Sequence, residues 1–211
     1  MRYVQHLAAS IIAVFACASA SAAVITASNT TYGVVDGTDA RRPLAVNVHG
    51  RITDVNITVE FSKCDDPPIG PNGSSCVGRS SPFENEFSLV LIGPNGQAAT
   101  LVEPFATYSV GTNGGAGRVS VIFDDEALQA AGPRVQAGSF RPAETLSQFD
   151  GMDLFGSWTL YLRDFLPSDP LEFFSASLEI AYEPAPVPEP ATLAMLGLGL
   201  GLMGMRAAKR R

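Results

Sequence analysis

Apolar and polar side chains alternate over several short segments of this chain, and the alternation limits the folds that it can adopt. In Ile52–Phe61, apolar residues lie two apart from Val55 onward, with polar residues between them. This period of two is typical of a β-strand that buries one face. The same pattern recurs in Trp158–Leu162 and in Ala176–Tyr182. Residues 23–187 contain no long segment with a helical period, so the sequence favours strands.

Turn signals separate further strand candidates. Phe87–Ile92 is an almost continuous apolar run, which predicts a central strand. Gly93–Gly96 predicts a tight turn, and Ala99–Val102 is the expected hairpin partner. We expect residues 24–44 to form an extended approach with one strand, and Ala127–Ala131 to form one helical turn. Short strands joined by glycine- and proline-rich turns predict an all-β fold, an antiparallel jelly-roll-like β-sandwich.

The N-terminal residues have the parts of a secretory signal peptide. Arg2 supplies the positive charge, Leu7–Ala18 is apolar, and small residues follow at the spacing that signal peptidase cleaves. We expect residues 1–22 to be removed by cleavage between Ala22 and Ala23, with signal peptidase as a partner during export.

The three cysteines divide between the signal peptide and the body of the chain. A lipid attachment site at Cys17 is an alternative to simple cleavage, but the bulky Phe15 fits it poorly. Cys64 and Cys76 form an even pair in an exported chain, which predicts a disulfide. It would stabilise the fold by about 3 kcal/mol. A zinc site in their place would need more histidine or cysteine than the remaining His49 supplies.

Acidic residues dominate the part of the chain between residues 23 and 187. This part has nine basic and 20 acidic residues, and so a formal net charge of −11. Such a charge is repelled by nucleic acid and by anionic lipid surfaces, so we expect no nucleic-acid partner. This negative charge is compatible with a well-solvated surface or with calcium sites.

The C-terminal residues differ in composition from the rest. Residues 183–187 predict a stiff, proline-rich spacer. Ala191–Met205 is an uncharged run of 15 residues, whereas a comfortable bilayer span needs roughly 20. The run predicts a short transmembrane helix, as a lasting or a temporary anchor, with its basic end in the cytoplasm. The flanking groups are Pro188, Glu189 and Pro190 before it and Arg206, Lys209, Arg210 and Arg211 after it.

Residues 188–211 resemble the PEP-CTERM sorting signal of exported Gram-negative bacterial proteins. The Pro-Glu-Pro motif, the short apolar helix and the basic end occur in the order of that signal. The resemblance implies that an exosortase, a membrane enzyme of the transpeptidase type, recognises and removes the tail. It therefore implies export across the inner membrane and a transient anchor there. The protein would then be released to, or attached at, the cell surface or extracellular matrix.

The body of the chain resembles the P domain, the β-sandwich that follows the catalytic domain in subtilisin-like proprotein convertases. Motifs in the order of that family are Ile52–Val59, Phe87–Gly96, Val121–Ala127, Phe140–Pro142 with Leu146–Gly151, and Gly156–Asp164. The resemblance implies one jelly-roll-like sandwich over residues 24–182. The chain departs from the family at Phe61–Lys63, where a histidine is expected, and at the Cys64–Cys76 loop, which looks like an insertion.

Candidate catalytic groups are few. A serine-hydrolase triad needs a histidine base, and we expect His49 to be a surface or turn residue. The family's catalytic domain does not precede the P-domain motifs here. A pair of carboxylates could be drawn from the acids between Asp124 and Asp153, but nothing in the sequence predicts that two of them converge. We therefore expect a non-enzymatic protein.

Calcium is the metal for which the sequence offers candidate ligands, and no other cofactor is expected. Asp124, Asp125 and Asp150 supply hard oxygen atoms, as do Asp164 and Asp169. The alternative is that these side chains stabilise turns by bonding to their own backbone.

Aromatic rings in loop-like segments are candidates for stacking on sugars. Phe105, Tyr108 and Phe165 are of this kind, whereas Trp158 follows the inward alternation and is expected in the core. Three functions remain open. The chain could be a structural or adhesive component of the extracellular polymer layer, a carbohydrate-binding module for exopolysaccharide, or an accessory partner of a secreted protease, the last by analogy with the P domain.

Overall fold

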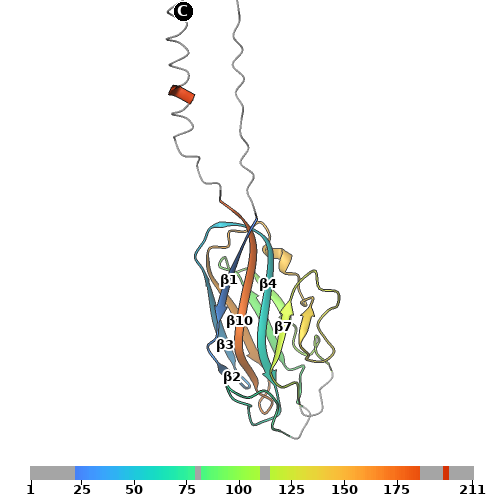
Figure 1. The fold of residues 1–211 in the computed structure, drawn as a ribbon. Coiled ribbons are helices and arrows are strands. Elements are labelled where there is room, and N and C mark those ends of the chain that lie inside the picture. The colour runs from blue at the N-terminus through green and yellow to red at the C-terminus, as the bar shows by residue number, and fades with distance from the viewer. Residues whose placement is uncertain (1–21, 79–81, 110–114, 186–196, 200–211) are drawn as a thin grey trace, which may run out of the picture.

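The computed structural model describes residues 22–78, 82–109, 115–185 and 197–199, and nearly all of its regular structure is β-strand. Two sheets form the body of the molecule (Figure 1). The larger sheet contains β1 (Ala23–Asn29), β2 (Gly33–Val35), β4 (Gly50–Lys63), β7 (Val119–Phe123), β8 (Gly138–Phe140) and β10 (Leu171–Pro184). The smaller sheet contains β3 (Asp39–Val46), β5 (Phe87–Ile92), β6 (Ala98–Val102) and β9 (Gly156–Asp164).

The long strands β4 and β10 form the centre of the larger sheet. The strand order is β1-β10-β4-β7-β8, and β2 also pairs with β10. In the smaller sheet the order is β3-β9-β5-β6, so β5 is central and β6 is its hairpin partner, as the sequence predicts. All pairs are antiparallel except β7 with β8, which is parallel. The all-β, two-sheet prediction is therefore confirmed, and the parallel pair is a departure from it.

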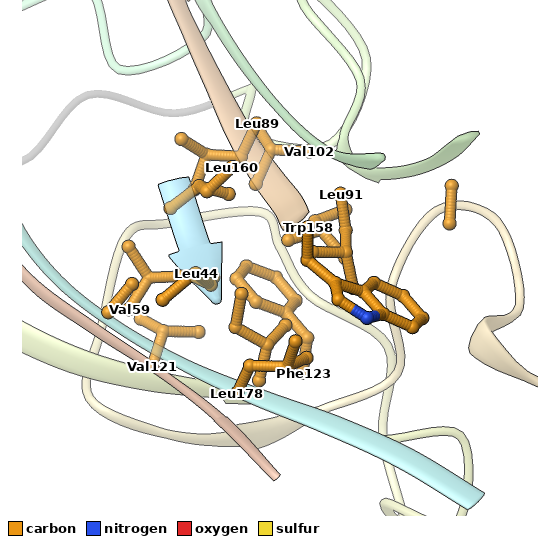
Figure 2. Close-up of a cluster of buried hydrophobic side chains, with 14 of the residues drawn as sticks. Leu44, Val59, Leu89, Leu91, Val102, Val121, Phe123, Trp158, Leu160 and Leu178 are labelled. Atoms are coloured by element: carbon orange, nitrogen blue, oxygen red, sulfur yellow. The ribbon is translucent and has the colours of Figure 1, made fainter. Parts of the chain in front are cut away.

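The core lies between the two sheets and is built from their inward-facing residues (Figure 2). Trp158 is fully buried, as predicted. Its ring lies edge-on to Phe149 with 5.0 Å between centroids, and its Nε1 donates a hydrogen bond to the Leu154 carbonyl oxygen at 3.0 Å. The indole therefore buries its apolar surface without leaving its one donor unsatisfied.

A bulge in β4 explains an irregularity in its apolar pattern. Ile52 pairs with Tyr182 and Asp54 with Ala181, so the two strands shift register at this point. The extra residue on β4 lets Ile52 and Val55 both face the core although they are three positions apart. The strict alternation begins only after the bulge.

The N-terminal prediction was wrong in the number of strands. Residues 24–44 contain β1, β2 and most of β3 instead of one strand. β1 and β3 are edge strands with one and two buried residues respectively, so they lack a strong alternating signal. Pro43 is tolerated in β3 because this strand lies at the border of the sheet, where the backbone has no neighbouring strand to pair with along one edge. Ala127–Ala131 forms no helix, and a short 3-10 helix occurs instead at Leu146–Phe149.

The two ends of the folded body lie together. Ala23 at the start of β1 pairs with Tyr182 near the end of β10. We call this end of the sandwich the tail pole, defined by His49, Gly50, Asp153 and Pro184, and the opposite end, defined by Lys63, Glu86 and Asp164, the distal pole. The sorting motif and the basic end lie outside the described residues. Of the predicted signal peptide only Ala22 is described, and of the apolar run only residues 197–199. Among the residues described, no helix is long and apolar enough to cross a bilayer.

Candidate functional site

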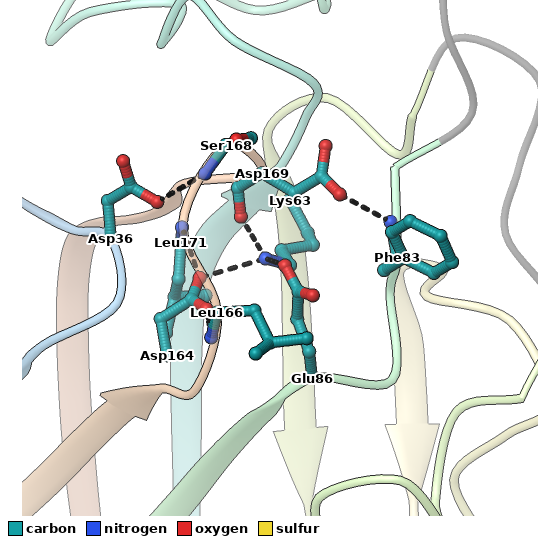
Figure 3. Close-up of polar contacts among 9 residues, drawn as sticks. All are labelled: Asp36, Lys63, Phe83, Glu86, Asp164, Leu166, Ser168, Asp169 and Leu171. Carbon is teal, nitrogen blue, oxygen red and sulfur yellow. Dashed lines mark hydrogen bonds and ion pairs between the residues drawn. The ribbon is translucent and has the colours of Figure 1, made fainter.

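A fully buried lysine is the centre of the most unusual polar cluster in the described structure. Lys63, the last residue of β4, donates hydrogen bonds to Glu86 Oε1 at 2.7 Å and to Asp164 Oδ2 at 2.8 Å (Figure 3). Its third contact is the backbone oxygen of Asp169. We call these four residues the lysine cluster. The side chains of Lys63, Glu86 and Asp164 are at most 1% exposed, so the charges face one another rather than water.

Backbone groups hold the acids of the lysine cluster in place. Asp164 accepts hydrogen bonds from the amides of Leu166 and Leu171, at 3.3 and 3.2 Å. Asp169 Oδ2 accepts one from Phe83 N at 3.0 Å. Burial raises the pKa values of Glu86, Asp164 and Asp169, and this effect exceeds the opposing attraction of the Lys63 ammonium.

Lys63 was missed as a site residue, although the sequence holds a signal for it. Val55, Ile57, Val59 and Phe61 face inward at intervals of two, and residue 63 continues this series. A lysine at an inward position needs a buried partner. Asp164 and Asp169, treated above as calcium or turn residues, supply the partner atoms here.

The lysine cluster predicts an unusual dependence of stability on pH. Glu86, Asp164 and Asp169 have raised pKa values, so the folded state keeps protons that the unfolded chain has already released. The free energy of unfolding should therefore fall as the pH rises above the ordinary carboxyl range of about 4. We expect a lower urea midpoint at pH 8 than at pH 5.

Glu86→Gln is the matched variant for this measurement, because it removes one titrating group and keeps the size of the side chain. It should reduce the difference between the two midpoints. Carboxyls with lowered pKa values titrate below this window and do not contribute; they are Glu60, Glu144 and Asp153. Equal midpoints at pH 5 and pH 8, in native protein whose Lys63 and Asp164 side chains are both free, would contradict the prediction.

Glu172, a buried acid outside the lysine cluster, fastens the disulfide loop to the larger sheet. The predicted Cys64–Cys76 disulfide is present. Within its loop, the amides of Ile69 and Gly70 donate to the Glu172 carboxylate of β10, both at 2.8 Å. The hydroxyls of Ser62 and Tyr32 donate to the same carboxylate, at 2.8 and 2.7 Å. Glu172 therefore accepts four hydrogen bonds and ties an otherwise irregular loop to the distal pole.

The tail pole carries an exposed histidine–aspartate pair. His49 lies between β3 and β4, exposed as predicted, and its Nδ1 is 2.7 Å from Asp153 Oδ2. Its ring stacks on Phe155 with 4.2 Å between centroids. The hydrogen bond from His49 lowers the pKa of Asp153, which also accepts hydrogen bonds from the Gly50 and Phe155 amides.

An open cavity of about 700 Å³ lies beside this pair. Its lining joins the start of β4 to the loop before β9 and to the end of β10, and includes His49, Arg51, Met152, Asp153 and Glu183. It therefore presents a cation, two acids and apolar surface. The His49 ring in this lining stacks on Phe155, which is 46% exposed. Such a mixture can bind a polar ligand that also has an apolar face.

Two of the three calcium candidates accept hydrogen bonds from backbone amides. Asp125 accepts from the amides of Leu146 and Ser147, at 2.9 and 2.8 Å, and so caps the short 3-10 helix. Asp124 accepts from the Glu126 amide at 2.7 Å. Burial and neighbouring acids raise the pKa of Asp150. Within the described ranges, no three histidine, cysteine or acidic side chains are grouped to hold a metal ion, and calcium binding stays a prediction.

The loop aromatics differ in exposure. Tyr108 is 2% exposed and stacks on Phe87 of β5, so it is a core residue and its assignment as a sugar-stacking candidate was wrong. Phe105 is 54% exposed and contacts Phe165, with 5.7 Å between centroids. The exposed phenylalanine rings thus lie at both ends, with Phe83 and Phe105 at the distal pole and Phe155 at the tail pole.

Comparison with solved structures finds distant likenesses in fold. The chain is similar to a chain in the crystal structure of the Aeromonas sobria serine protease in complex with its chaperone, at 12% identity and a TM-score of 0.40. It is similar to the serine protease of Aeromonas sobria alone at 10% identity and a TM-score of 0.38. These matches cover 77% and 76% of this chain but 28% and 27% of the others.

Comparison of sequences separates the tail from the body. No curated protein matches the chain. The protein-family comparison matches residues 186–211, and the model that they match is the PEP-CTERM protein-sorting motif. This match confirms the prediction for the tail, whereas the P-domain resemblance of the body stays a prediction. The motif indicates that the chain is exported and processed by an exosortase.

Proposed function

We propose that this protein is a non-enzymatic β-sandwich, sorted to the cell surface by its tail, where it is a structural or adhesive component of the extracellular polymer layer. The observation that supports this proposal most is the position of the two ends. β1 begins at Ala23 and β10 ends at Pro184, side by side at the tail pole. Cleavage before Ala23 and within the tail would therefore leave every paired strand intact.

Deleting residues 188–211 should change where the protein goes without changing how it folds. The deleted residues lie beyond β10, so we expect the same circular dichroism spectrum and the same urea midpoint. Cell fractionation should show loss of the protein from the cell surface. Val187→Ala is the matched control, because it alters the spacer and keeps the Pro-Glu-Pro motif. Equal amounts at the surface with and without the tail would refute the sorting function.

The cavity at the tail pole favours a second candidate, a carbohydrate-binding module for exopolysaccharide. Pyranose rings present apolar C–H faces and polar hydroxyls. The exposed Phe155 ring stacks on His49, and His49 lines the cavity together with charged groups that include Arg51 and Glu183. An aromatic ring can stack on such a face while charged groups accept or donate hydrogen bonds to the hydroxyls.

Calorimetric titration of the processed protein with exopolysaccharide, with and without calcium, tests this candidate. If the cavity binds sugar, Phe155→Ala should weaken binding about tenfold, which corresponds to about 1.4 kcal/mol. Phe105→Ala is the control, because it removes an exposed ring at the distal pole. Loss of binding in the Phe105 variant alone would place the sugar site at the distal pole. The absence of saturable binding to the native protein would refute the carbohydrate-binding function.

A further inference from the structure

The lysine cluster places an amine of one sheet against two carboxyl groups of the other. Lys63 ends β4 in the larger sheet. Asp164 ends β9, and Glu86 directly precedes β5, in the smaller sheet. The Nζ atom is within 2.8 Å of an oxygen of each acid. The amine therefore lies in hydrogen-bond contact with both carboxyl groups, and the fold holds these groups together without further rearrangement of the sheets.

Burial makes the charged form of the two acids less favourable. One buried ammonium faces two buried carboxylates, which is an expensive arrangement of charge in a medium of low polarity. Transfer of a proton from Lys63 to a carboxylate gives a neutral amine and a neutral acid. Burial raises the pKa values of both Glu86 and Asp164, so each acid holds a proton more readily than it would in water. A neutral, desolvated lysine amine is a nucleophile.

The two acids are not equivalent. Asp164 accepts backbone hydrogen bonds on both oxygens, from Leu166 at Oδ1 and from Leu171 at Oδ2. Such donors stabilise the negative charge that develops on a carboxyl group under nucleophilic attack. Glu86 has its Oε1 2.7 Å from Nζ, where it can take and return a proton.

We propose that Lys63 and Asp164 join in an amide bond, an intramolecular isopeptide cross-link between the two sheets. Nζ attacks Cγ of Asp164, and a new N–C bond forms. One C–O bond of the carboxyl group breaks, and its oxygen leaves as water. The ammonium supplies both hydrogens of that water, with Glu86 passing a proton from nitrogen to the departing oxygen. No oxidant, metal or second substrate is needed.

The cross-link is independent of the proposed function and goes beyond it. It would fasten the ends of β4 and β9 next to the disulfide at Cys64. The distal pole would then be closed by two covalent links, one within a loop and one between the sheets. We expect the sandwich to resist separation of its sheets even in strong denaturant.

Peptide mass spectrometry of the secreted protein tests the cross-link directly. After reduction, denaturation and trypsin digestion, the Lys63–Cys64 bond should remain uncut because the amine is acylated. Residues 52–79 should appear joined to the peptide that begins at Asp164, with a combined mass lower by one water. Cleavage at Lys63 and separate peptides of unchanged mass would overturn the proposal. A link from Lys63 to residues 80–118, which contain Glu86, would overturn the assignment of Asp164.

Glu86→Gln tests the role of the proton carrier. The amide keeps the size and a hydrogen-bond acceptor for Lys63 but cannot pass a proton. We expect cross-linking to slow about 100-fold or more, followed as the cross-linked fraction against time after synthesis. At low pH the uncross-linked variant should have the same urea midpoint as the uncross-linked native protein, which would show that the variant folds. A cross-linking rate equal to that of the native protein would refute the role of Glu86.

Discussion

Lys63→Met should lower the free energy of unfolding by about 3–5 kcal/mol relative to the native chain in which Lys63 and Asp164 are not yet joined, the largest loss that we expect from a single polar residue in this domain. Methionine fills similar space but leaves Glu86 and Asp164 buried without a cation. The loss should be larger at pH 8 than at pH 5, because the two acids can protonate at the lower pH. Urea denaturation at both pH values measures it.

The control for this variant removes the stranded charges as well. Lys63→Met combined with Glu86→Gln and Asp164→Asn leaves no ionisable group among these three positions. A buried ion cluster replaced by neutral groups of similar shape often costs little. Most of the stability should therefore return at pH 8. If the single Lys63→Met variant were as stable as the native protein, the lysine cluster would contribute nothing measurable to the free energy of unfolding.

Trp158→Ala should cost about 3–5 kcal/mol by opening a cavity in the core. Trp158 is fully buried and packs edge-on against Phe149, so both the transfer energy and these contacts are lost. Thermal or urea denaturation gives the value. Val24→Ala is the control, because Val24 is 62% exposed on β1 and its truncation should stay within about 0.5 kcal/mol. Similar losses in both variants would mean that Trp158 does not anchor the core.

The sequence predicts the central strands better than the edges, for a physical reason. β5 and β9 are buried, so their apolar patterns reflect the core directly. β1 and β3 lie at edges, where polar and charged residues such as Arg41 are tolerated, so the pattern is weak. β8 is only three residues long and pairs in parallel with β7, an arrangement that local pattern does not reveal.

The polar clusters were predicted less well, because their members are far apart in sequence. Lys63 continues an inward alternation and could have been found from the sequence alone. Its partnership with Glu86 and Asp164 depends on how the two sheets pack, which no local motif records. The Cys64–Cys76 disulfide was predictable because the signal peptide is visible in the sequence and two cysteines remain once it is removed. The tail motif was predictable because its three parts are contiguous.

β10 has a mechanical consequence for a protein that is attached to a surface through its processed C-terminal end. This strand continues directly toward the tail and is hydrogen-bonded on both edges, to β1 and β2 on one side and to β4 on the other. A pull on the C-terminal end of β10 acts along the axis of this strand. The hydrogen bonds of both edges then bear the load together in shear and cannot open one by one like a zipper. Drag from flowing liquid would therefore pull the sheet in the direction in which its hydrogen bonds resist separation most strongly.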